Sequence, residues 1–330
     1  MLKLSRLAGR QRYFSCGRLL WRLFSSFHDT SSPPSPSTGL RDHNISQMFG
    51  VYEDVMSIRI HYLRQGVGAK NILLFPGPLG SGITDYMDFL RRLSTKKFTA
   101  IAFDPPGCGL SIPPARDWSD PEVLLQDARV GVTLMHQLGH LPFSCVGWSE
   151  GAQSALLAAS ELNFDDSIQS LVVWCLDGDI AAEDRSENGS RLNGRTFDPL
   201  HSVYDLEAWP DSRRLPLQAL YGKEYLRDSW KAYVEAKMVR RMRSAVLHRL
   251  PQRLRQMPIL HIGSPLVGTQ RHVGADSQSA ESALLACPGC QSTVWPDCPD
   301  IEQDAGWLPH KLHADFFQSC VEKFLLESTA

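Results

Sequence analysis

Gly147-Trp148-Ser149-Glu150-Gly151 is the stretch of this sequence that decides the fold, and it has the form G-x-S-x-G. An apolar, strand-like run (143–146) precedes it, and an Ala/Leu-rich, helix-like run (152–159) follows it. Between a strand and a helix, this motif holds its serine exposed on a sharp turn, and glycine is needed where a side chain would collide with neighbouring backbone. The pentapeptide therefore predicts that Ser149 is a nucleophile at the end of a central strand.

Strand-like and helix-like patterns alternate on both sides of this motif. The predicted strands are 57–62, 71–75, 98–103, 143–146, 171–174, 259–262 and 294–295, and the predicted helices are 86–93, 119–139, 152–159 and 314–326. Such alternation is typical of a parallel sheet covered on both faces. We therefore predict an α/β fold with a doubly wound, mostly parallel sheet, into which the irregular, polar segment 177–255 is inserted as a helical cap.

The N-terminal segment differs in composition from the rest of the chain. Its first 28 residues are rich in Arg, contain Ser and carry no acidic residue before Asp29. This composition is typical of a mitochondrial presequence, with a disordered basic tail as the alternative. A Pro/Ser-rich stretch, SSPPSPST at 31–38, follows it and cannot pack. We therefore assign 1–30 to a presequence for a mitochondrial protein, 31–45 to a disordered linker and 46–330 to the α/β domain.

Composition and charge exclude several classes of partner. The chain has 330 residues, of which 43% are hydrophobic, and its net charge is -2. The chain is long and apolar enough to bury a sizeable core. Its small net charge gives no strong electrostatic field that would recruit nucleic acid or an anionic membrane. No apolar run is long enough to span a bilayer. We expect a monomer that acts on a small molecule and binds neither nucleic acid nor membrane.

Three cysteines resemble part of a zinc site. Cys287 and Cys290 have the C-x-x-C spacing, and Cys298 follows them. A fourth ligand at a fitting spacing is missing, and the prolines and glycine around these residues indicate a loop. We therefore expect neither a metal nor another cofactor.

Four motifs give the chain a resemblance to the α/β-hydrolase superfamily, and more closely to the valacyclovir hydrolase (biphenyl hydrolase-like) family of mitochondria. They are FPGPLGSG at 75–82, FDPPGCGLS at 103–111, GWSEG at 147–151 and LQALYGKEY at 217–225. The resemblance implies an α/β-hydrolase fold with a helical cap and hydrolysis of α-amino-acid esters without a cofactor. It also implies that the acidic residue after the serine, here Glu150, binds the ammonium group of the substrate. Family members usually have Asp there, so the longer Glu is expected to shift the preferred substrate.

Acyl transfer also requires N–H donors for the developing oxyanion. In this fold the first donor is the residue after the nucleophile, here Glu150, and the second comes from the loop after the strand at 71–75. Pro78 in that loop has no N–H group. Leu79 follows it and can donate, and the resemblance points to the same residue. We therefore predict an oxyanion hole made by the N–H groups of Glu150 and Leu79.

The base and the acid of a catalytic triad are not at their family positions. After the strand at 259–262 the family has Gly-x-x-Asp, whereas this chain continues Gly-Ser-Pro-Leu-Val at 263–267. Asp177, just beyond the strand at 171–174, and Asp276 are the two candidates for the acid. The resemblance places Trp307 where the catalytic His belongs. His310 lies three residues further on, whereas His313 is expected on the last helix. We assign His310 as the base and Asp177 as the acid, and an ordinary surface role for His310 remains the alternative.

These residues leave two functions open. The first is a serine hydrolase of small esters, including α-amino-acid esters, that works through an acyl-enzyme on Ser149. The second is a catalytically impaired homologue that acts as a binding or scaffold protein, because the acid and the base of the triad are displaced. The segment 263–307 can also reflect a splice or gene-model difference, in which case another isoform carries the complete triad.

Overall fold

The computed structural model describes residues 50–163, 165–176, 205–209, 211–239, 250, 252–254, 256–263, 280–296 and 308–328. The predicted presequence (1–30) and linker (31–45) lie outside these ranges, as does much of the predicted cap segment (177–255).

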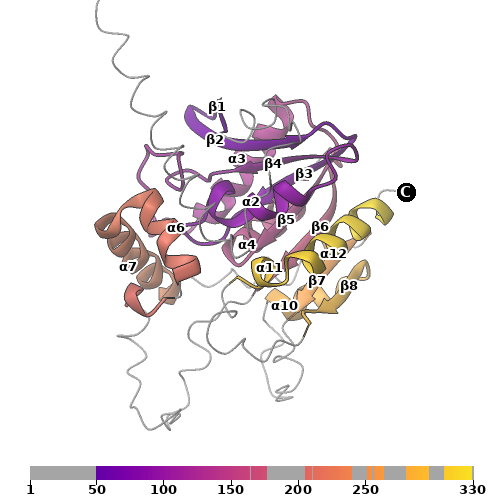
Figure 1. Cartoon of the computed structure of the whole chain (residues 1–330). Helices are drawn as coiled ribbons and strands as arrows, with labels where there is room; N and C mark the ends of the chain where they lie inside the picture. The colour runs from indigo at the N-terminus through magenta and orange to yellow at the C-terminus, as the bar shows by residue number, and fades with distance from the viewer. Residues whose placement is uncertain are drawn as a thin grey trace, which may run out of the picture.

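Among the described residues, eight strands form one sheet in the order β1-β2-β4-β3-β5-β6-β7-β8 (Figure 1). The strands are β1 (Val51–Val55), β2 (Ile58–Gly66), β3 (Lys70–Phe75), β4 (Phe98–Phe103), β5 (Phe143–Trp148), β6 (Ile168–Trp174), β7 (Ile259–Gly263) and β8 (Cys290–Val294). β2 is antiparallel to β1 and to β4, and the remaining neighbours are parallel. The prediction of a mostly parallel sheet is therefore confirmed.

Helices cover both faces of this sheet, because its central strands are apolar on both sides. Along β3, Ile72 and Leu74 join one core cluster, whereas Leu73 and Phe75 join the other, as the two-residue period of a strand requires. α2 (Gly82–Arg92) and α12 (Ala314–Glu327) pack on the first cluster. α3 (Val123–Gln137) and α4 (Glu150–Leu157) pack on the second. The sheet is doubly wound, as predicted.

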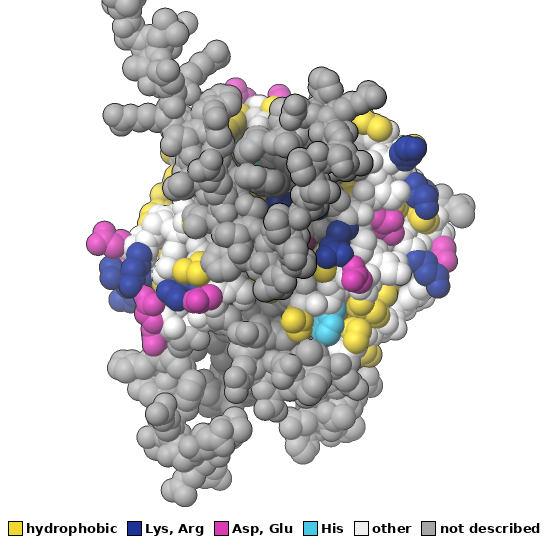
Figure 2. Space-filling model, viewed as in Figure 1, with side chains coloured by type: hydrophobic (Ala, Val, Ile, Leu, Met, Phe, Trp, Pro, Cys, Tyr) yellow, Lys and Arg dark blue, Asp and Glu magenta, His cyan; other side chains and the backbone are white. Residues whose placement is uncertain are grey.

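Most of the described part of the cap consists of two helices and a short turn of 3₁₀ helix. These are Leu206–Ala208, α6 (Asp211–Tyr221) and α7 (Lys223–Val239), and the two helices lie to the left of the sheet in Figure 1. They form a third core of their own around Trp209, Leu217 and Trp230, which also includes Leu79 and Trp118 from the sheet domain. On their outer side, Lys/Arg and Asp/Glu side chains are interspersed (Figure 2), so this surface is a solvated mixture of both charges.

Several elements differ from the sequence-based prediction. The last strand is Cys290–Val294 and not 294–295, so the Cys-x-x-Cys pair lies at the start of a strand. The edge strand β1 and the short helices α10 (Ala280–Leu285) and α11 (Pro309–Leu312) were not predicted. The helix after the nucleophile begins at Glu150 and continues beyond Leu157 as a π-helical turn, Ala158–Leu162. None of the helices in the described ranges has the length and apolar character needed to cross a membrane.

Candidate active site

Ser149 lies between β5 and α4 in a conformation that only a tight turn imposes. Its φ is 54° and its ψ is -124°, and its N–H donates to the carbonyl oxygen of Trp174 over 3.1 Å. A Cβ atom on Gly147 would lie 2.5 Å from the carbonyl oxygen of Gly151, and a Cβ atom on Gly151 would lie 2.3 Å from that of Phe75. These contacts explain both glycines of the motif, and the geometry is that of the predicted nucleophile elbow.

The Ser149 hydroxyl is hydrogen-bonded to the next residue in the chain. Its Oγ donates to Oε2 of Glu150 over 2.7 Å. The other carboxylate oxygen, Oε1, accepts a hydrogen bond from the hydroxyl of Tyr233 on α7. All three residues are buried, with exposed fractions of 8% for Ser149, 6% for Glu150 and 1% for Tyr233. The candidate site is therefore a closed chain of Ser, Glu and Tyr that joins the sheet domain to the cap.

His310, the predicted base, lies on α11 inside a cage of aromatic rings. Its imidazole centroid is 5.1 Å from that of Trp174, 5.5 Å from that of Trp148 and 5.8 Å from that of Phe317. The residue is 4% exposed, so it is not the surface histidine that the alternative interpretation expected.

Both ring nitrogens of His310 have other partners than Ser149. Nδ1 accepts from the indole Nε1 of Trp174 over 3.3 Å, and Nε2 lies 3.3 Å from the carbonyl oxygen of Asp85, to which it donates. Burial, helped by the charge of Lys311, lowers the pKa of His310 to about 3, so the imidazole is neutral. Within the described ranges the Ser149 hydroxyl is bonded to Glu150 and to no imidazole. The predicted pairing of His310 with Ser149 is therefore absent from this arrangement.

The other residues considered for the triad and for a metal site lie mostly outside the described ranges. Asp177 and Asp276, the two candidates for the acid, and Trp307 are among them. His313 is not inside the last helix, as was expected, but is the residue before α12. Cys298 is outside as well, and the described part of the chain contains no group of three or more His, Cys, Asp or Glu side chains that could hold a metal ion.

Leu79, a predicted oxyanion donor, lies in a strained turn after β3. Its φ is 56°, and the side chain is buried. Its carbonyl oxygen accepts from the hydroxyl of Tyr221 on α6 over 2.9 Å, and the N–H of Gly109 donates to the same hydroxyl over 2.6 Å. The second predicted donor, the N–H of Glu150, is at the first residue of α4, where N–H groups have no partner within the helix. The oxyanion hole made by these two N–H groups stays a prediction.

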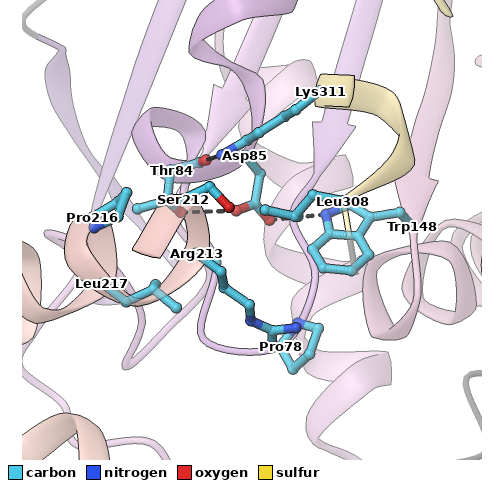
Figure 3. A pocket seen from close by; sticks show the side chains of 11 residues that line it. Pro78, Thr84, Asp85, Trp148, Ser212, Arg213, Pro216, Leu217, Leu308 and Lys311 are labelled. Atoms are coloured by element: carbon cyan, nitrogen blue, oxygen red, sulfur yellow. Dashed lines mark hydrogen bonds between the residues drawn. The ribbon is translucent and has the colours of Figure 1, made fainter. Parts of the chain in front are cut away.

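Asp85 connects the loop after β3 to the end of β5 beside the nucleophile elbow. Its Oδ2 accepts from the N–H of Gly77 over 2.9 Å. Its Oδ2 also accepts from Nε1 of Trp148 over 2.9 Å, and its Oδ1 accepts from the hydroxyl of Thr84 over 2.8 Å; both of these partners are drawn in Figure 3. Burial raises the pKa of Asp85, whereas the charge of Lys311 and these hydrogen bonds act against the increase. A buried carboxylate with three donors is satisfied, so Asp85 fixes the backbone of the loop after β3, called the oxyanion loop below because it carries the predicted donor Leu79.

Arg213 brings a buried positive charge from α6 to the same region. Its guanidinium carbon lies 4.2 Å from the ring centroid of Trp209, and in Figure 3 its side chain points toward Pro78. Burial lowers the pKa of Arg213 to about 10, and the charges of Asp85, Tyr233 and Glu150 oppose this decrease. Arg213 also lines a cavity of about 10 Å³ together with Asp85 and Lys311. That volume holds about one water molecule.

Sequence reasoning missed four of these residues, for two different reasons. Tyr221 is in the LQALYGKEY stretch that carried part of the resemblance, and Asp85 lies in the first turn of α2, which begins at the last residue of FPGPLGSG, so both had a signal nearby. Tyr233 and Arg213 belong to the irregular segment of the cap, where no sequence motif marked them as site residues. Only the packing of α6 and α7 against the elbow brings them to the site.

Comparison with known proteins agrees with this geometry. A model of the alpha/beta hydrolase family matches residues 72–310. Two curated relatives are similar over 181 residues, 55% of this chain: the protein named serine hydrolase BPHL from Mus musculus, at 36% identity, and its counterpart from Homo sapiens, at 34%. The aligned part spans 57% of the length of each relative.

Solved structures share the fold at low sequence identity. A membrane phospholipase A described as a bacterial virulence factor matches with a TM-score of 0.60 and 15% identity, over 96% of this chain and 93% of its own. The enol-lactonase from Burkholderia xenovorans LB400 matches with a TM-score of 0.55 and 18% identity, over 84% of this chain and 100% of its own.

Proposed function

The chain belongs to the alpha/beta hydrolase family, as its four motifs predicted, and on that premise we propose that it is a serine hydrolase of small esters. The observation that supports this proposal most directly is the conformation of Ser149, with a φ of 54° between β5 and α4. Such a conformation costs about 1–3 kcal/mol for a residue other than glycine, and strain of this kind is concentrated at functional sites.

The proposed reaction has two acyl-transfer steps. Ser149 Oγ attacks the ester carbonyl, the N–H groups of Glu150 and Leu79 receive the oxyanion, and the alcohol leaves. Water then releases the acid from the acyl-enzyme. The triad predicted from the sequence would add His310 as the base and Asp177 as its orienting acid. For His310 to take that role, its ring has to leave Trp174 and the Asp85 carbonyl, to which it is now bonded.

A fluorophosphonate probe tests the nucleophile. We predict that the wild-type protein is covalently labelled and that Ser149→Ala, with an unchanged circular dichroism spectrum, is not. Ser154→Ala is a matched control, because Ser154 is a buried serine one turn further along α4, and it is expected to be labelled like the wild type. If the folded wild-type protein resists the probe at every pH between about 6 and 9, the proposed activity is wrong.

The substrate class follows from the acidic residue beside the nucleophile. We propose that α-amino-acid esters are among the substrates, because Glu150 puts a carboxylate 2.7 Å from the Ser149 hydroxyl, within reach of the α-ammonium group of such an ester. The measurement compares kcat/KM for an α-amino-acid ester and for the same ester without the amino group. Equal values for the two esters would show that Glu150 does not select the ammonium group.

A binding function is the second candidate, and the environment of His310 is the observation that favours it. An imidazole with both nitrogens engaged and a pKa of about 3 is a poor base at neutral pH. A protein that binds the same esters without turnover would bind them equally well as wild type and as Ser149→Ala, and neither form would release the alcohol. Equilibrium binding and product assays on the same two proteins separate this candidate from the hydrolase.

A further inference from the structure

The proton of the Ser149 hydroxyl points at a carboxylate, and its acceptor is the adjacent residue in the chain. We propose that Glu150 is the general base for Ser149, with Tyr233 as the residue that positions it, so that Ser, Glu and Tyr replace the usual Ser, His and Asp. This inference rests on the proposed function, since it names the proton acceptor of that same reaction.

The geometry meets the requirement for a general base. Glu150 Oε2 lies 2.7 Å from Ser149 Oγ, within the 2.6–3.2 Å that proton transfer needs. Glu150 begins α4 on a rigid elbow, and its second oxygen is held by the Tyr233 hydroxyl from the opposite wall. A base with one oxygen on the nucleophile and the other on an orienting group has the arrangement that defines a triad.

The charges that face Glu150 favour a carboxylate. From α7 it faces Tyr233, and from α6 the charge of Arg213 is close enough for the two to interact. Asp85 on α2 is the other acidic group that interacts with Arg213. The attraction between Glu150 and Arg213 is reciprocal, so the guanidinium stabilises the ionised form that can accept a proton. Because Glu150 is buried, this interaction is only weakly screened by water and salt.

The proton balance closes with ester and water alone. As Ser149 Oγ bonds to the acyl carbon, its proton passes to Glu150 Oε2, and the tetrahedral oxyanion forms. When the bond to the alkoxide breaks, Glu150 returns the proton and a neutral alcohol leaves. Water then attacks the acyl-enzyme, gives a proton to Glu150, and Glu150 returns it to Ser149 as the acid is released.

This role differs from that of an ammonium anchor in one measurable way. An anchor matters only for esters that carry the ammonium group, whereas a base matters for every ester. Glu150→Gln keeps the size of the side chain and removes its basicity, so a neutral ester distinguishes the two roles. We expect Glu150→Gln to lower kcat/KM for a neutral ester, and the rate of fluorophosphonate labelling, by about 10³-fold or more.

Controls keep this test independent of folding. Glu224→Gln is the matched variant, because Glu224 is an exposed glutamate at the start of α7, and it should react like the wild type. Glu150→Asp shortens the side chain by one methylene group, so part of the rate should return relative to Glu150→Gln. Denaturation curves of each variant show whether the protein is folded.

Tyr233→Phe tests the positioning residue. Without the phenol, the carboxylate loses a donor that favours its ionised form, so the acid limb of the pH–rate profile should move to higher pH while kcat falls about 10-fold. A purely structural role for Tyr233 would lower stability without moving that limb. Tyr225→Phe, on the same helix and 37% exposed, is the control that should leave the limb in place.

Each result supports or overturns the inference. If Glu150→Gln, folded and labelled at the wild-type rate, still hydrolyses the neutral ester, the inference is wrong although the proposed function stands. The same holds if His310→Asn, with its fold intact, loses as much activity as Glu150→Gln. If the wild type is not labelled at all, the proposed function fails and this inference fails with it.

Discussion

Ser149 combines two properties: a backbone with positive φ and a hydrogen bond from its hydroxyl to the adjacent residue, Glu150. The first belongs to the tight turn between β5 and α4, where the backbone packs so closely that a Cβ atom on Gly147 or Gly151 would clash. The second follows from the first, since the turn points the hydroxyl and the Glu150 carboxylate to the same side. The turn thus sets both the conformation of the proposed nucleophile and the acceptor of its hydroxyl proton.

His310 shows how burial changes a predicted role. Its pKa of about 3 lies below the ordinary 6.5, chiefly because of burial, so the unfolded chain binds the proton more tightly than the folded protein does. The stabilisation from neutral His310 is therefore complete above about pH 6.5 and is lost as the pH falls toward 3. Between about pH 7.5 and pH 5 the loss is about 2 kcal/mol.

We predict that urea denaturation shows this decrease in the free energy of unfolding as the pH falls. In His310→Gln the decrease should be smaller by about 2 kcal/mol. His261, whose pKa burial lowers to about 4, contributes in the same direction and remains in the variant. Asp85 has a raised pKa and acts in the opposite direction, since the folded state then binds its proton more tightly. If both proteins show the same pH dependence, His310 is not buried as a neutral group.

At the scale of elements, the secondary-structure prediction was correct where buried residues produce an apolar pattern in the sequence. The strand 98–103 was predicted with the bounds that β4 has, because all six of its residues are buried and apolar or β-branched. β1 was missed because only Val55 of its five residues is buried, and α11 because four residues are too few for a helical period. Apolar periodicity reports burial, so exposed edges and single turns escape it.

Tyr221 links one cap helix to two loops of the sheet domain, and it provides a test at this scale. Tyr221→Phe leaves the Leu79 carbonyl without its donor and the Gly109 N–H without its acceptor. We expect a loss of about 1–3 kcal/mol in the free energy of unfolding, the cost of a buried polar group left unpaired, and slower fluorophosphonate labelling as the oxyanion loop relaxes. Chemical denaturation and labelling rates measure the two effects. Unchanged values for both would show that neither loop depends on this hydroxyl.

At the scale of the molecule, the candidate site lies where three cores meet. Ser149 and Glu150 come from the junction of β5 and α4, Leu79 belongs to the same cluster as the cap helices, and Tyr233 and Arg213 come from the cap. The sharp turn at Ser149 between β5 and α4 was predictable because a short motif encodes it. The hydrogen bond between Tyr233 and the Glu150 carboxylate was not predictable, since the two residues are 83 positions apart in the chain and only the packing of the cap brings them together.

Because the cap has its own core, it should open without unfolding the sheet. Trp230 is 1% exposed and stacks edge-on against Trp209 at 4.6 Å, inside the cap cluster. Trp230→Ala removes about 3–5 kcal/mol of packing, most of it from this local unit. We predict that hydrogen exchange becomes at least about 10²-fold faster in α6 and α7 while amides of β3 and β5 keep their protection, and that Ser149 labelling slows because Tyr233 no longer holds Glu150.

A variant in the sheet core, Phe317→Ala, should instead lower the protection of strands and cap together. If Trp230→Ala accelerates hydrogen exchange equally in α7 and β5, the cap and the sheet unfold as one unit. In that case the site cannot open for a substrate by movement of the cap alone.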